Sequence, residues 1–218
     1  MRKKRMIIDE RFRTYINSID MPHTDFLENL YLEAVKNDVP VIRREMQSFL
    51  KTFLLIARPK NILEVGTAVG FSAILMAQYA PHPCFITTIE NYEKRILEAR
   101  KNIPASGHGD KIKLIEGDAL EVLKTLDRPY DFIFMDAAKG QYINFLPDIK
   151  ALMKPGSILI SDNVLQDGDI IESRFVVERR DRTIHKRMRE YLYALKHDEE
   201  FSTSIIPLGD GITISVKR

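Results

Sequence analysis

Acidic side chains follow or end five consecutive apolar runs of this sequence. They are Glu64, Glu90, Asp118, Asp136 and Asp162. In an open α/β sheet, ligands bind beyond the carboxyl ends of the strands. An aspartate in such a position is often only a turn former or a helix cap. Five acids in succession at the one rim where ligands bind favour a binding site over turn formation alone.

The loop after the first run contains Gly66 and Gly70 but lacks the full G-x-G-x-x-G pattern, so it is weak evidence for a dinucleotide. No P-loop lysine follows, which argues against a nucleoside triphosphate. Glu64 suits a cationic ligand better than a pyrophosphate. Glu90 has the spacing for ribose hydroxyls, and Asp118 is placed for an adenine amine. These residues predict a positively charged nucleoside without phosphate, which is the description of S-adenosylmethionine.

A second group of side chains offers hard oxygen ligands. Asp136, Asp162 and Asn163 end neighbouring runs, and oxygen ligands favour Mg²⁺, Ca²⁺ or Mn²⁺ over zinc. The alternative is that Asp162 and Asn163 only cap the following segment. Lys139 is a candidate general base near this site, with an ordinary solvated lysine as the alternative. Cys84 is the only cysteine, which excludes an intrachain disulfide and a zinc site of several thiolates.

The elements that must position these residues alternate between strand and helix. Strands are predicted at 61–65, 85–89, 112–115, 132–135 and 157–161, and helices between them at 72–79, 92–102, 119–126 and 142–153. Near-continuous apolar strands alternating with helices indicate a parallel sheet covered on both faces.

The two ends of the chain have different patterns. Residues 1–60 read as helical, with Tyr31, Leu32 and Val35 on one apolar face. A charged helix is predicted at 178–197, followed by strands at 203–207 and 212–216 that the turn Gly209-Asp210-Gly211 joins into an antiparallel hairpin. The predicted fold is α/β: a Rossmann-like, doubly wound, seven-stranded sheet, mostly parallel, with N-terminal helices. We expect a single domain over 1–218, with a helical extension (1–60) and a catalytic core (61–218).

Composition places this chain among cytoplasmic globular proteins. It has 218 residues, 44% hydrophobic and 29% charged, with a net charge of only +2, so bulk charge does not identify a nucleic-acid binder. No run approaches the roughly 18 apolar residues of a membrane span. The basic cluster at residues 2–5 is not followed by the apolar stretch of a secretory signal.

Several segments together resemble the cation-dependent class I S-adenosylmethionine O-methyltransferases, the group of the catechol and caffeoyl-CoA enzymes. The matching segments are Leu63-Glu64-Val65-Gly66-Thr67-Ala68, Thr88-Ile89-Glu90, Glu116-Gly117-Asp118-Ala119, the stretch from Phe134 to Tyr142, and Ile160-Ser161-Asp162-Asn163-Val164-Leu165. The resemblance implies that the cofactor is contacted by Ile42, Gly66, Ser72, Glu90, Asp118, Ala119 and Asp136. It implies a metal held by Asp136, Asp162 and Asn163, with Lys139 as the base and Asp136 also in the catalytic machinery.

Within this group the chain is most similar to the bacterial tRNA 5-hydroxyuridine methyltransferases, through residues 136–142, 162–165 and 205–211. That resemblance implies methylation of 5-hydroxyuridine at wobble position 34 of tRNA to 5-methoxyuridine, with Mg²⁺. It also implies a homodimer. Two alternatives remain: a methyltransferase of small catechols or phenylpropanoids, and a nucleotide-binding module without catalysis.

A local excess of positive charge supports a tRNA surface. Residues 174–189 contain seven Lys and Arg and two acids, a local charge of +5 against +2 for the whole chain. The helix expected here would pack through Ile184, Met188, Tyr191 and Leu195 and turn its arginines outward. Predicted RNA-binding residues are Arg43, Arg44, Arg174, Arg179, Arg180 and Arg182, because arginine suits phosphate. A merely solvated helix face is the alternative.

Overall fold

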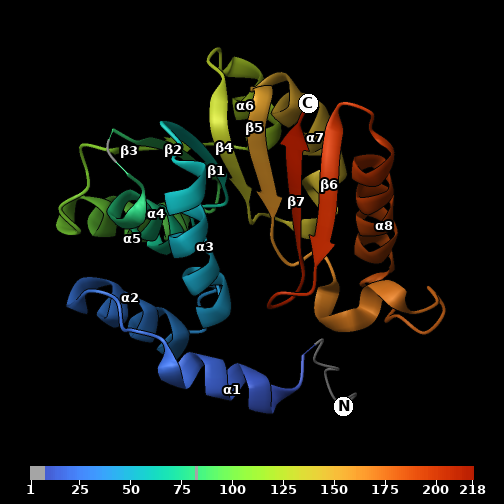
Figure 1. Cartoon of the computed structure of the whole chain (residues 1–218), viewed down its shortest axis with the longest axis horizontal. Coiled ribbons are helices and arrows are strands. Elements are labelled where there is room, and N and C mark those ends of the chain that lie inside the picture. Colours follow the sequence, from blue (N-terminus) through green and yellow to red (C-terminus); the bar gives the residue numbers. More distant parts are fainter. Residues whose placement is uncertain (1–7, 82) are drawn as a thin grey trace.

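A computed structural model describes residues 8–81 and 83–218, and its centre is one seven-stranded sheet (Figure 1). The strand order is β3-β2-β1-β4-β5-β7-β6. The strands are β1 (Asn61–Val65), β2 (Phe85–Glu90), β3 (Ile112–Glu116), β4 (Tyr130–Met135), β5 (Met153–Ser161), β6 (Phe201–Ile206) and β7 (Ile212–Lys217). The first five pair in parallel, and β7 runs antiparallel to both of its neighbours. The predicted fold class is confirmed.

Side chains of the central strands point alternately into two hydrophobic cores. Ile62 of β1 belongs to one core, whereas Leu63 and Val65 belong to the other. All three are at most 1% exposed, as are Phe132 and Phe134 of β4. A strand that is buried on both faces must be apolar nearly throughout, which is why these runs stand out in the sequence.

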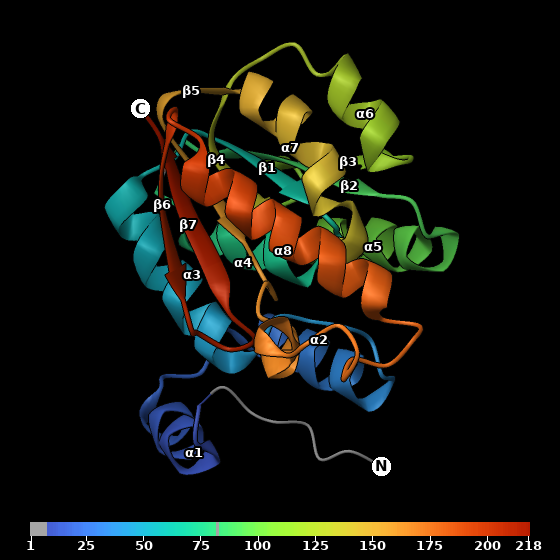
Figure 2. The ribbon, with the colours of Figure 1, turned by 90° about the vertical axis from the view of Figure 1, so that its right-hand side faces the viewer.

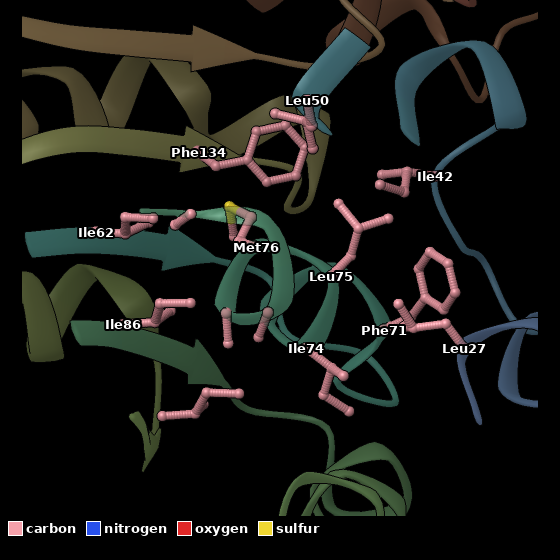
Figure 3. Packing of buried hydrophobic residues seen from close by; sticks show 14 of the residues in the cluster. Leu27, Ile42, Leu50, Ile62, Phe71, Ile74, Leu75, Met76, Ile86 and Phe134 are labelled. Atoms are coloured by element: carbon pink, nitrogen blue, oxygen red, sulfur yellow. The ribbon is translucent and has the colours of Figure 1, made fainter. Parts of the chain in front are cut away.

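Helices cover both faces of the sheet (Figure 2). The first core is closed by α3 (Arg44–Ala57), α4 (Phe71–Tyr79) and α5 (Glu93–Ala105). Figure 3 shows Leu50 of α3 and Met76 of α4 near Phe134 of β4 in this core. The second core is closed by α6 (Ala119–Thr125), α7 (Tyr142–Ala151) and α8 (Arg182–His197).

The first two helices, α1 (Glu10–Ile19) and α2 (Asp25–Lys36), lie beyond the end of the sheet to which β5 and β6 point (Figure 1). The apolar face expected on α2 was partly wrong, since Leu32 and Val35 are 58% and 50% exposed. The buried stripe is instead Leu27, Leu30 and Ala34, a set spaced by three and four residues that fits one face of a helix. No described helix is long and apolar enough to cross a membrane.

The C-terminal part differs from its prediction at several boundaries: β6 begins at Phe201 and not at residue 203, and it ends at Ile206 and not at residue 207. The charged helix starts at Arg182, not at residue 178, because residues 178–181 form turns. Met188, Tyr191 and Leu195 of α8 are fully buried, as its apolar pattern predicts, and Ile184 is half-buried. Since β7 pairs antiparallel with β5, with Thr213 beside Ser161, the turn between β6 and β7 lies at the carboxyl end of β5.

Candidate active site

The strand order reverses between β1 and β4, and the loops that follow these two strands meet there. The amide of Asp136 donates to the carbonyl of Val65 at 3.0 Å. A pocket of about 580 Å³ opens beside this contact. Most of the predicted site residues line it, namely Ile42, Gly66, Ser72, Glu90, Asp118, Ala119, Asp136, Lys139 and Asn163. The remaining two, Glu64 and Asp162, are buried and are not part of its lining.

Gly66 is required by the close approach of the two loops. Its φ is +102°, and a Cβ atom there would lie 2.3 Å from the carbonyl oxygen of Asp136. No side chain fits such a gap, and the backbone conformation is one that residues other than glycine rarely adopt. The glycine therefore sets the distance between the first loop and the loop that carries Asp136.

Replacing Gly66 by alanine is expected to lower the free energy of unfolding by about 3 kcal/mol or more, because the steric clash adds to the backbone strain. Gly156→Ala is the matched control, since Gly156 also has a positive φ, of +86°, but a Cβ atom added there would meet no other atom within 4 Å. We expect the free energy of unfolding of this control variant to fall by only about 1 kcal/mol. Urea unfolding of both variants measures the difference, and equal losses would show that the loop contact does not require glycine.

Glu90 and Asp118 hold their own loops while they line the pocket. One carboxylate oxygen of Glu90 accepts the amide of Ala68 at 2.8 Å, and the other accepts the amides of Asn91 and Tyr92, both at 2.9 Å. Asp118 caps α6 by accepting the amide of Leu120 at 2.8 Å. The capping role expected as an alternative is thus present at Asp118, together with a place in the pocket wall.

Glu64 is a fully buried carboxyl group directly before the glycine loop. The hydroxyl of Thr88 donates to its Oε2 at 2.5 Å, and within the part of the chain that the structure describes its Oε1 has no hydrogen-bond partner. Burial raises the pKa of Glu64 to about 8, although the hydroxyls of Ser72 and Thr88 oppose the shift. A cation bound nearby would favour the ionised form of this group.

The shifted pKa of Glu64 predicts a pH dependence of stability. When the pKa of a carboxyl group is higher in the folded than in the unfolded protein, the group contributes fully to the free energy of unfolding only at pH values below its unfolded-state pKa. This contribution is lost as the pH rises towards the folded-state pKa. Glutamine does not ionise, so its free energy of unfolding lacks this loss. Between pH 5 and pH 8 we therefore expect the free energy of unfolding of Glu64→Gln to rise relative to that of the wild type by up to about 1.4 kcal/mol per pH unit. Urea unfolding without cofactor at several pH values measures the gain, and parallel curves for the two proteins would contradict it.

Asp136 and Asp162 lie at the ends of the neighbouring strands β4 and β5. The amide of Asp162 donates to the carbonyl of Met135 at 2.9 Å. The buried hydroxyl of Tyr142 lies 3.1 Å from the carbonyl oxygens of both Met135 and Asp162 and shares its proton between them. Asn163 follows with a φ of +57°. These contacts fix the two strand ends side by side.

Burial raises the pKa of both aspartates, and the charge of Asp136 raises that of Asp162 further. Within residues 8–81 and 83–218, no three His, Cys, Asp or Glu side chains form a group suited to a metal ion. The predicted ligand set contains only two carboxylates, since its third member is an amide. The arrangement therefore brings together two carboxyl groups whose negative charges are poorly compensated by the protein.

Lys139 begins the short helix η1 (Lys139–Gln141), and its Nζ lies 3.4 Å from Oδ2 of Asp210. Asp210 is only 4% exposed. In the sequence, Asp210 lies between two glycines, and this pattern predicts only a turn. The signal that it belongs to the site is topological: an antiparallel final strand beside β5 places the preceding turn at the carboxyl end of β5.

The arginines assigned to RNA binding fall into two groups. Several make contacts within the protein: Arg43 pairs with Asp167 at 3.0 Å, Arg44 pairs with Glu28 at 2.6 Å, and Arg182 donates to the carbonyl of Val177 at 3.2 Å. Three others are exposed, namely Arg174, Arg179 and Arg180, although Arg180 also pairs with Glu178 at 3.0 Å. The expectation that all arginines of this segment point outward was thus wrong for Arg182, because its guanidinium group satisfies backbone carbonyls of the turns before α8.

Known proteins share both the sequence pattern and the fold. The caffeoyl-CoA O-methyltransferase 1 of Eucalyptus globulus is 32% identical over 182 residues, which cover 76% of this chain and 70% of that protein. The catechol O-methyltransferase of Niastella koreensis is 34% identical over 128 residues, and this match spans 57% of this chain and 58% of that relative.

Two solved structures extend the similarity over nearly the whole chain. A Staphylococcus aureus protein proposed to be a caffeoyl-CoA O-methyltransferase has a TM-score of 0.88 at 31% identity, covering 96% of this chain and 100% of that one. The SAH-bound methyltransferase PaMTH1 of Podospora anserina has a TM-score of 0.86 at 26% identity, and the match covers 96% of this chain and 94% of that one. The sequence profile described as O-methyltransferase matches residues 17–218. The chain therefore belongs to the O-methyltransferase family.

Proposed function

We propose that this protein transfers the methyl group of S-adenosylmethionine to one of two adjacent oxygens on an unsaturated ring, and that a divalent cation assists. One observation carries the proposal. A single pocket is lined both by the glycine loop, Glu90 and Asp118 and by Asp136, Lys139 and Asn163. A methyl donor and an acceptor can thus meet within one pocket.

The first group of lining residues fits the donor. Gly66 lies in the pocket lining, and Glu64, whose Oε1 has no hydrogen-bond partner among the described residues, lies in the strand before this loop. Glu90 and Asp118 keep free lone pairs beside the hydrogen bonds that they accept, since each carboxylate oxygen can accept two. S-adenosylmethionine supplies a methyl group on a positively charged sulfur, and carboxyl groups are suitable neighbours for that charge. The SAH-bound relative from Podospora supports this choice of cofactor.

The side chains near the ends of β4 and β5 fit a hard cation. Asp136, Asp162 and Asn163 offer only oxygen ligands, which Mg²⁺ and Ca²⁺ prefer. Burial raises the pKa values of the two aspartates, and the nearby charge of Lys139 opposes this shift only in part. A divalent cation held there would lower the pKa of an acceptor hydroxyl and so help it to ionise.

The protein's own groups then orient and deprotonate the acceptor. Lys139 lies at the pocket wall, 33% exposed, and is placed to take the hydroxyl proton. Apolar side chains of the lining exclude water from the reacting oxygen, among them Val41, Phe71 and Phe145. Holding donor and acceptor in line supplies a further large part of the rate acceleration.

The relatives favour a small catechol-type acceptor. The named enzymes among them act on catechol or on caffeoyl-CoA, and both acceptors carry two hydroxyls on neighbouring ring carbons. The test is incubation of the protein with S-adenosylmethionine, Mg²⁺ and a panel of catechols, with methylated products identified by mass spectrometry. Monomethylated catechol that disappears on chelation with EDTA is the expected result. No methyl transfer to any vicinal oxygen pair, in small molecules or in tRNA, would refute the proposed function.

A second acceptor, 5-hydroxyuridine at the wobble position of tRNA, is favoured by the basic segment. It also presents two adjacent oxygens, and a wobble base is unpaired and can enter a pocket. Around the start of α8 a hollow of about 310 Å³ is lined by four basic side chains, Arg174, Arg182, Lys186 and Arg187. Arg187 also donates to the carbonyl of Gly140 at 3.1 Å, directly after Lys139. The basic surface is therefore in contact with the loop of the candidate base. The predicted contribution of residues 2–5 lies outside the described residues.

The two acceptors can be separated by neutralising exposed charge. In an Arg179→Gln/Arg180→Gln variant, methylation of tRNA should fall at least tenfold while turnover of a catechol stays unchanged, because arginine contacts to phosphate add affinity only for nucleic acid. Lys94→Gln/Lys101→Gln on the exposed face of α5 removes the same charge elsewhere and is the control. Equal tRNA methylation by all three proteins would argue against an RNA surface at α8.

A further inference from the structure

The turn between β6 and β7, residues 207–211, packs against the loop that follows β5. The amides of Val164 and Leu165 donate to the carbonyls of Gly211 and Asp210 at 2.9 and 3.0 Å. A Cβ atom on Gly211 would lie 2.2 Å from Cγ of Leu165, so the two segments are in close contact. Asn163 belongs to this loop and cannot move independently of the turn.

The carboxylate of Asp210 joins three segments of the chain. Its Oδ1 accepts the amide of Asp167 in a short hydrogen bond, which closes the loop after β5. Its Oδ2 lies 3.4 Å from Nζ of Lys139, on the loop after β4. Asp167 in turn pairs with Arg43 at the start of α3 at 3.0 Å. One buried side chain therefore connects the segments that carry the candidate base and the candidate metal ligand.

The carboxylate of Asp210 is placed to accept a hydrogen bond from the Lys139 amine and to lie beside the positive charge that this amine gains with a proton. Burial raises the pKa of Asp210, and Lys139 opposes this shift more than any other group, with Arg43 also opposing it. A lysine side chain has four rotatable bonds and loses rotamer entropy when it is held in one place. Asp210 is the only ion-pair partner of Lys139 among the described residues, so it is the group that can hold the amine at the pocket wall.

We propose that Asp210 is a positioning residue of this enzyme, which holds Lys139 at the acceptor and fixes the loop of Asn163 with the same carboxylate. The inference rests on the proposed function, in which Lys139 receives the acceptor's proton. When the acceptor O–H bond breaks and the amine gains the proton, the new ammonium charge lies beside the Asp210 carboxylate. The role resembles that of a carboxylate which orients a catalytic base and stabilises its charged form.

Asp210→Asn isolates the contact with Lys139. The amide oxygen of asparagine can still accept the Asp167 amide, so the loop stays closed while the negative charge next to Lys139 is lost. We expect kcat for a catechol to fall 10- to 100-fold, with the KM for S-adenosylmethionine and the thermal midpoint little changed. Asp131→Asn is the matched control. Asp131 also pairs with a lysine, Lys154 at 2.7 Å, and accepts backbone amides, but it lies at the opposite end of β4 and should retain full activity.

A double-mutant cycle separates positioning from a general structural role. If Asp210 acts through Lys139, then Asp210→Asn/Lys139→Met should be no slower than Lys139→Met alone. A further 10-fold loss in the double variant, or an Asp210→Asn enzyme within twofold of wild type, would overturn the inference. Asp210→Ser removes the same charge with a smaller side chain and is the substitute if the asparagine variant does not fold.

A readout without turnover distinguishes failure of this inference from failure of the proposed function. If the wild type methylates no acceptor, the proposed function fails, and acetic anhydride labelling of Lys139, followed by mass spectrometry, tests Asp210 alone. We expect Lys139 to be labelled at least threefold faster in Asp210→Asn than in wild type, with Lys154 as the internal reference. Equal labelling rates would show that Asp210 does not hold the amine.

Discussion

Replacing Asp162 by alanine should lower kcat/KM about a thousandfold. Asp162 is buried beside Asp136, and the cation proposed between them would stabilise the transition state by on the order of 4 kcal/mol, where each 1.4 kcal/mol is worth a factor of ten. The measurement is the initial rate of catechol methylation over a titration of MgCl₂. The wild-type rate should rise to a plateau, and the variant rate should stay low at every concentration.

The loss should not come from unfolding. Burial and the neighbouring Asp136 raise the pKa of Asp162. The ionised form of Asp162 therefore destabilises the folded protein when no cation is bound. We therefore expect the thermal midpoint of Asp162→Ala without Mg²⁺ to stay within a few degrees of wild type, and Mg²⁺ to stabilise only the wild type. A variant with normal rates, in an enzyme that EDTA leaves active, would remove the cation from the mechanism.

Replacing Lys139 by methionine should lower kcat by a factor of about 10² to 10⁴, the range that general base catalysis contributes. Methionine keeps the length and the apolar stem of lysine but has no amine to take the proton. The dissociation constant for S-adenosylmethionine should be unchanged, because the cofactor is expected at Glu90 and Asp118 and Lys139 is expected to contact only the acceptor. Single-turnover rates and calorimetric titration of the cofactor measure the two quantities.

Two further measurements identify the proton transfer itself. A nitro-substituted catechol, whose hydroxyl is already ionised near neutral pH, should lose much less rate in Lys139→Met than an unsubstituted catechol does. A Lys139→Ala enzyme should regain part of its rate when ethylamine is added to the assay. If both acceptors slow down equally and no amine restores activity, Lys139 contributes through packing or charge and is not the base.

Much of the fold is predictable here because the central strands are buried on both faces. Burial makes runs such as 61–65 and 132–135 mostly apolar, and the chain leaves the sheet at Gly66 after the first and at Asp136 after the second. The bounds of β1 agree with the prediction, and so does a mostly parallel sheet of seven strands that ends in an antiparallel hairpin. For the same reason, residues that follow these strands, such as Glu90, Asp118 and Asp136, are found together at one pocket.

The features that the sequence did not predict depend on tertiary contacts. Periodicity finds an apolar stripe on α2, but Leu32 and Val35 fall outside the stripe that α4 covers, and only the packed structure selects Leu27 and Leu30. The role of Asp210 requires knowing that the turn between β6 and β7 returns to the end of β5. A single sequence does not show that this turn lies near the end of β5. From the sequence alone, the buried carboxylate of Asp210 therefore cannot be distinguished from that of an ordinary turn residue.

The closure of the loop after β5 by residues 207–211 also bears on how the protein is made. Synthesis on the ribosome proceeds from the N-terminus, so the sheet from β1 to β5 emerges before this turn does. A nascent chain arrested ahead of residue 207 would carry the pocket's glycine loop, yet Leu165 and Asp167 would lack the partners that hold them in place. Cofactor recognition can then arise during translation, whereas competence for methyl transfer must wait until the last hairpin has left the exit tunnel.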